Sequence, residues 1–477
     1  MIGATKSWSL SGLLVLGIAG CSSMQPQAGF SDVQGLVADR VPGQIYWNQG
    51  TPADAEVEQR ITVLLKEPLT VDAAVQIALL NNRNLQATYE ELGIAQADLV
   101  QAGLLKNPVI SFERRFSGQA LEVDVIQEFI DLIAIPLRKR IAGAAFEAAK
   151  LRVGQAVVDL AADVRASYYM LQGSEQMVEM RRSVVEGTEA SAALAERLHE
   201  AGNITDLDWR MEQRFAQRAR LDLALAEEEV AQEHEHLTPL MGVWGAETAW
   251  TIKIPLPDLP PTEVTLPGLE SHAVAQRLDL AASKQEIVAT AEALGLTRAL
   301  RFTSSVELAS HYEREKDGPF SVGPSLHLAL PIFDWGQAAV PRDRAILEQK
   351  RQRYVALAIE IRSQLRAAYS RMRSARERAE FYREIVIPLQ AEILEQAHLQ
   401  YNAMILGPLQ LFQTKQEEID AGVAYIEALR SYWVARVDLE RAAGGSVEGA
   451  WNAPAAEGSD TAAHGAELGH HHEEVNP

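Results

Sequence analysis

The feature that most constrains the fold is a proline-free stretch between Pro136 and Pro239. Ala, Leu, Glu, Arg and Val dominate this stretch, and all of them except Val are good helix formers. One interruption, His199–Thr205, contains Gly and Asn, which allow the left-handed backbone of a chain reversal. We therefore expect two antiparallel helices of about 62 and 35 residues, the first of them roughly 90 Å long at about 1.5 Å per residue.

The length of the first helix excludes an ordinary globular domain. Roughly 90 Å is about three times the apolar thickness of a bilayer, and a pair of such helices would protrude unpacked from a globular core. Residues 337–444 repeat the same helical composition, with a second reversal that starts at Tyr401. We therefore interpret the 477 residues as one internally duplicated unit rather than as two or three ordinary domains.

Fixed offsets relate the two copies. Pro331 lies 195 residues after Pro136, and Gly444 lies 202 residues after Gly242. The second long helix is therefore seven residues longer, which is two turns of a supercoiled helix and keeps its apolar face in phase. Pro388 lies inside it and is expected to kink it locally or to fall at an offset of the helix. The returning helix has a heptad pattern, and the positions that define this pattern are Phe412, Ile419, Ile426 and Trp433.

Two short alternating segments precede each long hairpin, at about residues 109–130 and 302–330. In the first pair, Val123 and Val125 alternate with Glu122 and Asp124. This period of two predicts four strands of about 10 residues with one apolar and one polar face, as in outer-membrane strands. Four strands cannot close in lipid, so we expect two copies to supply eight strands or three copies to supply twelve. The alternative is a small soluble antiparallel sheet.

The N-terminal segment has the features of an exported lipoprotein. Lys6 and the apolar residues after it are typical of a signal peptide, which we place at residues 1–20. The order Ile-Ala-Gly at 18–20 before Cys21 resembles a bacterial lipobox. Cys21 is the only cysteine in the chain, and we expect it to carry a diacylglyceryl group. Ser22, rather than an aspartate, fits sorting to the outer membrane.

Composition and offsets divide the rest of the chain. Within the first repeat, Thr70 is expected to cap a short helix that continues to about residue 105, and His272–Leu300 is its counterpart in the second. The expected segments are an extended arm at 21–68, a first repeat at 69–242 with its hairpin at about 137–241, a linker at 243–265, a second repeat at 266–444 with its hairpin at about 337–444, and a disordered tail at 445–477.

The formal net charge of −21 disfavours nucleic acid as a partner, because no basic stripe is available to neutralise phosphates. The sequence contains no His-Glu-x-x-His motif, phosphate loop or nucleophile elbow, so we expect neither an enzyme nor a cofactor. In the tail, His470, His471 and His472 precede two glutamates and are candidate ligands for a divalent metal. The alternative is an incidental polar tract.

The two hairpin tips carry a resemblance to a known family. The first reads His-Glu-Ala-Gly-Asn-Ile-Thr-Asp-Leu-Asp from 199 to 208, and the second reads Tyr-Asn-Ala-Met-Ile-Leu-Gly-Pro-Leu-Gln from 401 to 410. Both are similar to the Tyr-x-Ala-Gly-x-x-Ser/Thr-x-x-Asp pattern of the TolC-type outer-membrane efflux protein family. Asp131–Arg140 also looks like the point where this family passes from strand to helix. The resemblance covers residues 69–444.

The resemblance implies a mainly α fold with a membrane β-barrel contribution. Three chains would form a 12-stranded barrel in the outer membrane and a 12-helix tunnel across the periplasm. The partners implied are further copies of this chain, outer-membrane lipid, a periplasmic adaptor and an inner-membrane pump. The protein would be a passive duct for small molecules or metal ions, anchored to the outer membrane by its lipid. The alternatives are a type I protein secretion duct and a periplasmic coiled-coil lipoprotein without a pore.

The resemblance also selects site residues at the tips. The residues expected to contact the adaptor are Gly202, Asn203, Thr205, Asp208, Tyr401, Met404 and Gly407. Some family members narrow the periplasmic end with acidic side chains, and the candidates for a constriction here are Asp208, Gln410 and Gln413. The second tip departs from the pattern, because Met404 replaces the turn glycine and Gln410 replaces the acid. The alternative is that these residues only form tight turns.

Overall fold

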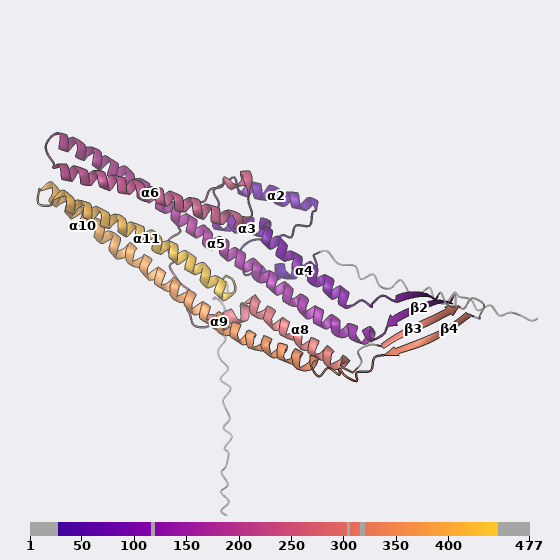
Figure 1. Ribbon diagram of the computed structural model, residues 1–477. Coiled ribbons are helices and arrows are strands. Elements are labelled where there is room, and N and C mark those ends of the chain that lie inside the picture. The colour runs from indigo at the N-terminus through magenta and orange to yellow at the C-terminus, as the bar shows by residue number, and fades with distance from the viewer. Residues whose placement is uncertain (1–26, 116–119, 303–305, 315–319, 447–477) are drawn as a thin grey trace, which may run out of the picture.

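The computed structural model describes residues 27–115, 120–302, 306–314 and 320–446. The molecule is an elongated helical body. A small sheet lies at one end, and the turns of two helical hairpins lie at the other (Figure 1). Cys21 and its signal peptide lie outside the described residues, as do His470, His471 and His472. Among the helices that are described, none combines the length and the apolar character needed to cross a bilayer.

The first hairpin consists of α5 (Ile130–Glu200) and α6 (Asp206–Met241). The predicted start of the long helix at residue 137 is wrong, because α5 begins seven residues earlier and includes Pro136. Proline has no N–H to donate to the carbonyl of Leu132, which costs the helix one hydrogen bond. An ion pair of 3.1 Å between Arg138 and Asp131 spans the proline and supports this first part of the helix.

The second hairpin consists of α9 (Ala339–Phe381), a π-helical turn η2 (Tyr382–Val386), α10 (Ile387–Asn402) and α11 (Pro408–Ala443). Pro388 follows directly after the π-helical turn, at the start of α10. A π turn inserts one residue into the helical ladder and is a known cause of local bending. The interruption expected at Pro388 is therefore present.

Each repeat has two short helices where a single one was expected. The first repeat contains α3 (Val71–Asn81) and α4 (Arg83–Ala102), and the second contains α7 (Leu269–Gln276) and α8 (Leu278–Leu300). Thr70 caps α3 as predicted, accepting a hydrogen bond of 3.2 Å from the N–H of Ala73. Asn82 interrupts the expected continuous helix because its side chain accepts from the N–H of Leu85 (2.9 Å) and donates to the carbonyl of Leu240 (2.9 Å).

The helix break and the hairpin end meet in both repeats. Arg277 has almost the same backbone angles as Asn82, which lies 195 residues earlier (ψ 117° and 118°). Gly242 ends α6 with φ +72°, and a Cβ atom there would lie 2.6 Å from the carbonyl oxygen of Asn81. Gly444 ends α11 with φ +94°, and its Cβ would lie 3.1 Å from the carbonyl carbon of Gln276. These matched contacts support the interpretation as two repeats.

The arm is packed more deeply than expected. It contains α1 (Phe30–Val37) and α2 (Pro52–Leu64), and Phe30 and Trp47 are both buried. Phe30 contacts Tyr89 of α4 edge to face at 5.2 Å between ring centroids. The arm therefore belongs to the core formed by α3, α4 and α5, whereas α9 and α11 enclose a second core. After the first hairpin, the chain forms a short 3-10 helix, η1 (Gly245–Thr248).

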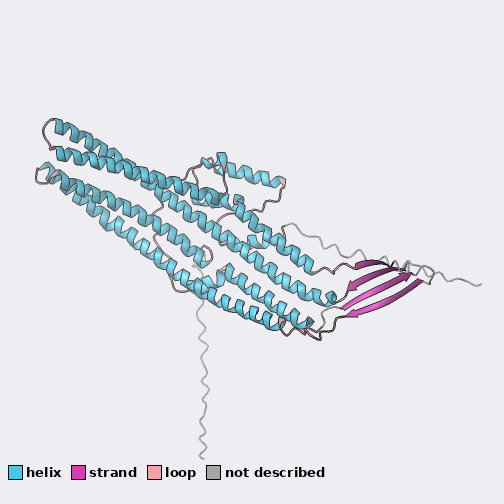
Figure 2. Cartoon of the chain, in the orientation of Figure 1, coloured by secondary structure: helices cyan, strands magenta, loops and turns pink. Residues whose placement is uncertain are grey.

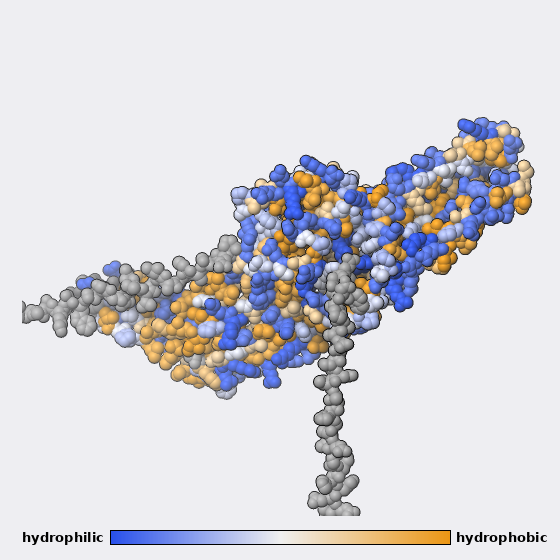
Figure 3. Space-filling model, turned by 180° about the vertical axis from the view of Figure 1, so that it is seen from behind, coloured by the Kyte–Doolittle hydropathy of each residue, from blue (hydrophilic) through white to orange (hydrophobic). Residues whose placement is uncertain are grey.

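The sheet contains β1 (Val109–Arg115), β2 (Ala120–Glu128), β3 (Val306–Arg314) and β4 (Phe320–Leu328). The four strands are antiparallel in the order β1-β2-β3-β4, so the middle pair joins the two repeats (Figure 2). The alternation places side chains on two different faces. The exposed apolar residues of one face are Ile110, Phe112, Val125, Leu308, Tyr312, Val322, Leu326 and Leu328. In Figure 3, apolar residues gather at this end of the molecule.

Candidate functional site: the hairpin tips

The two hairpin tips lie together at the end of the molecule opposite the sheet (Figure 1). The first is the turn between α5 and α6, and the second is the turn between α10 and α11. Near them, Phe215 of α6 stacks on Phe412 of α11 with 6.5 Å between ring centroids. This aromatic contact holds the two hairpins side by side just behind their tips.

The first tip is a hydrogen-bonded turn followed by a capped helix. Gly202 has φ +75°, which a residue with a side chain adopts only at a cost. The N–H of Asn203 donates to the carbonyl of Leu198 at 2.8 Å. Thr205 accepts from the N–H of Asp208 (3.1 Å), and the carboxylate of Asp208 accepts in return from the N–H of Thr205 (3.3 Å). Thr205 and Asp208 therefore form a capping box.

A stack of side chains stiffens this tip. The ring of His199 lies parallel to Trp209 at 4.9 Å between centroids, and the guanidinium of Arg210 lies 4.1 Å from the centroid of Trp209. Arg210 also lies 3.6 Å from Asp206. The stacked rings and the ion pair thus fix the turn, and a partner would contact a preformed surface.

The second tip forms the same turn from different residues. Met404 occupies the position of the turn glycine with φ +61°, and its N–H donates to the carbonyl of Tyr401 at 2.9 Å. Gln410 performs the task of Asp208, because its side-chain oxygen accepts from the N–H of Gly407 at 3.1 Å. Gly407 has no side chain with which to complete the capping box. The departures from the sequence pattern therefore keep the turn and remove one charge.

The predicted tip residues divide into two groups. Gly202, Thr205, Asp208 and Gln410 form the turns and caps, as the alternative interpretation expected. Met404 instead points outward, with 94% of its surface exposed. Sequence reasoning missed two further apolar residues at the tips, Leu207 (66% exposed) and Ile405 (74% exposed). The signal available was an isolated apolar residue within or directly after a turn, where polar residues are usual.

Gln413 lies away from the turn, in a hollow of about 400 Å³ between the two hairpins. The hollow is lined by Met211, Arg214, Phe215, Arg218, Phe412, Gln413 and Gln416. Next to Met211 along α6, the side chain of Glu212 is buried, and burial raises the pKa of its carboxyl. Gln413 therefore lines the hollow, whereas Asp208 and Gln410 cap the helices at the tips.

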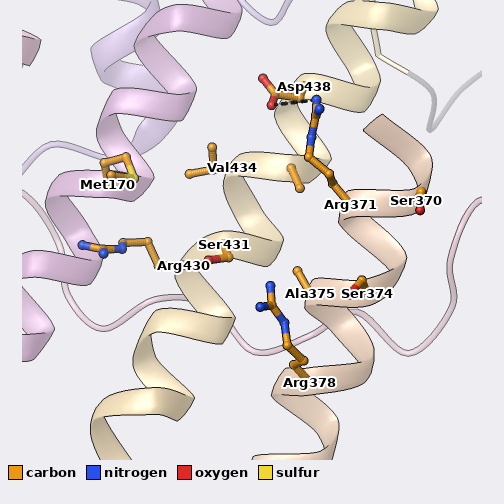
Figure 4. Close-up of a pocket in the computed structure, with 11 residues that line it drawn as sticks. Met170, Ser370, Arg371, Ser374, Ala375, Arg378, Arg430, Ser431, Val434 and Asp438 are labelled. Carbon is orange, nitrogen blue, oxygen red and sulfur yellow. Dashed lines mark ion pairs between the residues drawn. The ribbon is translucent and has the colours of Figure 1, made fainter. Parts of the chain in front are cut away.

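A second hollow of about 570 Å³ lies between α5, α9 and α11 (Figure 4). Arg371 and Asp438 point toward one another across it at 3.5 Å. Arg430 is held by Glu229 of α6 at 2.6 Å. The charges of Arg371 and Arg430 therefore join helices to one another inside the chain.

The chain is similar in sequence to several known proteins. The family model named outer membrane efflux protein matches residues 137–243, which covers most of α5 and all of α6. The cobalt-zinc-cadmium resistance protein CzcC of Cupriavidus metallidurans is 22% identical over 387 residues, covering 79% of this chain and 90% of CzcC. Outer membrane protein OprJ of Pseudomonas aeruginosa is 23% identical over 486 residues, covering 92% of this chain and 96% of OprJ.

The fold is also similar to that of solved structures. A crystal structure of a membrane protein from Pseudomonas aeruginosa superposes with a TM-score of 0.70 at 21% identity, covering 79% of this chain and 90% of that one. The chain is similar in sequence to outer membrane efflux proteins. This similarity agrees with the family predicted from the hairpin tips.

Proposed function

We propose that this protein is the outer-membrane channel of a tripartite pump and acts as a passive duct. An inner-membrane pump supplies the free energy, and a periplasmic adaptor joins that pump to the hairpin tips. The observation that carries the proposal is the two-ended geometry. A sheet with an exposed apolar face lies at one end, two exposed tips lie at the other, and long helices connect them (Figure 2).

The sheet is the reason for inferring that several copies assemble. Its outer strands, β1 and β4, have no further strand beside them among the described residues. Open edges do not persist in lipid. Because neighbouring strands alternate in direction, β4 of one copy is correctly oriented to pair with β1 of the next. Two copies would give eight strands and an interior filled by side chains, whereas three would give twelve and room for a channel.

The helices support the same inference. Exposed apolar residues recur at spacings of four along the second hairpin, at Val355 and Ile359 and again at Phe381 and Ile385. In isolation, this is a row of apolar surface exposed to water. Between neighbouring copies it would be buried, as between the helices of a bundle. We infer a homotrimer with a 12-stranded barrel and a periplasmic tunnel of twelve helices, four from each of three copies.

The rest of the proposed organisation follows the sequence. A diacylglyceryl group on Cys21 would anchor the mature N-terminus to outer-membrane lipid, and the arm would follow it along the body. The repeats at 69–242 and 266–444, joined by the linker at 243–265, would each supply one strand pair and one hairpin to the wall. Leu207, Met404 and Ile405 would dock against apolar residues of the adaptor.

The experiment that tests this function is deletion of the gene followed by complementation. The strain is exposed to cobalt, zinc, cadmium, copper and silver salts, and separately to dyes and antibiotics. Sensitivity that the intact gene reverses supports an efflux duct and names the cargo. Unchanged resistance together with loss of one secreted protein would support a type I secretion duct instead. A purified protein that runs only as a monomer and conducts no ions would support a spacer without a pore.

A further inference from the structure

The polar face of the sheet brings acidic residues from both repeats into one row. Glu113 of β1 lies opposite Glu122 of β2, and Glu122 lies opposite Glu313 of β3. Carboxylates directly opposite one another repel. Glu122 is also 95% buried, since only 5% of its surface is exposed, so this row is sheltered from bulk water.

A histidine in the next row faces these carboxylates. His311 of β3 lies opposite Asp124 of β2, and its Nδ1 atom lies 2.6 Å from the carboxylate oxygen of Asp124. When the imidazole is neutral, a carboxylate at Nδ1 favours the tautomer with its proton there, and Nε2 would then offer its lone pair, as in metal-binding histidines. The Nε2 atom lies 3.9 Å from the carboxylate of Glu313.

Three candidate ligand atoms therefore converge. One each from Glu122, His311 and Glu313 lie within 4.8 Å of one another, so small side-chain rotations would bring them to one ion. One imidazole and two carboxylates form a donor set suited to zinc and to similar divalent transition metals.

We propose that Glu122, His311 and Glu313 bind a divalent transition-metal ion on the polar face of the sheet, with Asp124 orienting His311. Three protein ligands leave a fourth position for water or for exchange, unlike a closed structural site. Such a site suits an ion in transit. The transit role rests on the proposed duct, in which this face lines the interior, whereas the binding itself does not.

The binding test uses the full purified chain in detergent with zinc ions alone as the ligand. The histidines of the tail are removed first, as H470A/H471A/H472A, so that only the sheet site is measured by titration calorimetry. In this background we expect H311A and E313Q each to weaken zinc binding at least tenfold. D124N should weaken it about tenfold, as loss of an orienting partner does. Cobalt ions should give a visible absorption band that H311A abolishes.

The matched control is H327A. His327 lies on the same face of β4 and is 3.9 Å from Glu307, but it is outside the cluster. It should leave zinc affinity unchanged, and circular dichroism should show that every variant is folded. Equal affinity in H311A, E313Q and the parent, or no zinc binding by the parent, would overturn the proposal.

A second arm separates this proposal from the proposed function. H311A is assayed for conductance in planar bilayers and for complementation of the deletion strain. Loss of zinc binding with conductance retained and metal resistance reduced supports a transit site. If the parent protein binds zinc but does not conduct, the metal site is supported and the proposed duct is contradicted. A conducting H311A variant that has lost zinc binding and restores full metal resistance would overturn the transit role.

Discussion

At the residue scale, Met404 occupies a left-handed backbone conformation that usually requires glycine. The conformation costs a residue with a side chain about 1–2 kcal/mol, and glycine loses about 0.4–1 kcal/mol more through the entropy of the unfolded chain. Met404→Gly should therefore raise the free energy of unfolding by roughly 0.5–1 kcal/mol, measured by chemical denaturation. If Met404 is retained for contact with a partner, the same variant should bind the adaptor more weakly.

Gly242 combines a positive φ with a close backbone neighbour. It should therefore tolerate substitution less well than a glycine that has a positive φ and open space around it. Gly242→Ala would place its Cβ 2.6 Å from the carbonyl oxygen of Asn81, whereas Gly268 also has positive φ but no atom within 4 Å. Gly242→Ala should lower the free energy of unfolding by about 1–3 kcal/mol more than Gly268→Ala, because only the first is overpacked. Equal losses in the two variants would show that the backbone angle alone sets the cost.

The buried carboxyl of Glu212 should make the stability of the fold depend on pH. Burial raises the pKa of its carboxyl, so ionisation is less favourable in the folded chain than in the unfolded one. A raised carboxyl pKa destabilises the fold increasingly as pH rises above the unfolded value, and the penalty is absent at lower pH. Glu212→Gln should therefore raise the melting temperature at pH 7 and not at pH 4. Glu235→Gln, at an exposed position of the same helix, should have little effect at either pH.

At the element scale, two glycines of α5 should respond oppositely to one substitution. A Cβ at Gly173 would lie 2.5 Å from Cδ and 3.0 Å from Cβ of Arg430 in α11, whereas Gly187 has open space around it. Gly173→Ala should destabilise the contact between the hairpins by about 1–3 kcal/mol. Gly187→Ala should stabilise the helix by about 0.5–1 kcal/mol, since alanine is the better helix former. Chemical denaturation of the two single variants checks both signs.

The elements were predictable to different degrees. The absence of proline between Pro136 and Pro239 predicted the first hairpin. The alternation around Val123 predicted a strand and the residues that share one of its faces, because a strand repeats every two residues. Pro136 misled the prediction of the helix start, since the ion pair of Arg138 with Asp131 is a contact that helix propensity does not report. Asn82 ends a helix through a bond to the carbonyl of Leu240, a partner far away in sequence.

At the scale of the whole molecule, the predicted family and the order of its elements agree with the structure and the comparisons. The tip pattern in two copies was sufficient to predict the similarity to outer membrane efflux proteins. The cluster around His311 was not predictable, because Asp124 and His311 are 187 residues apart and meet only when β2 of one repeat pairs with β3 of the other. The exposure of Leu207 and Ile405 likewise depends on the arrangement of the tips.

The central claim is that copies of this chain together enclose a water-filled path. The most direct measurement is the conductance of the purified mature protein reconstituted into a planar lipid bilayer. The account predicts discrete, stable current steps that appear only with assembled trimers. A folded protein that remains monomeric in water without detergent, and that leaves the bilayer current at its baseline, would contradict it.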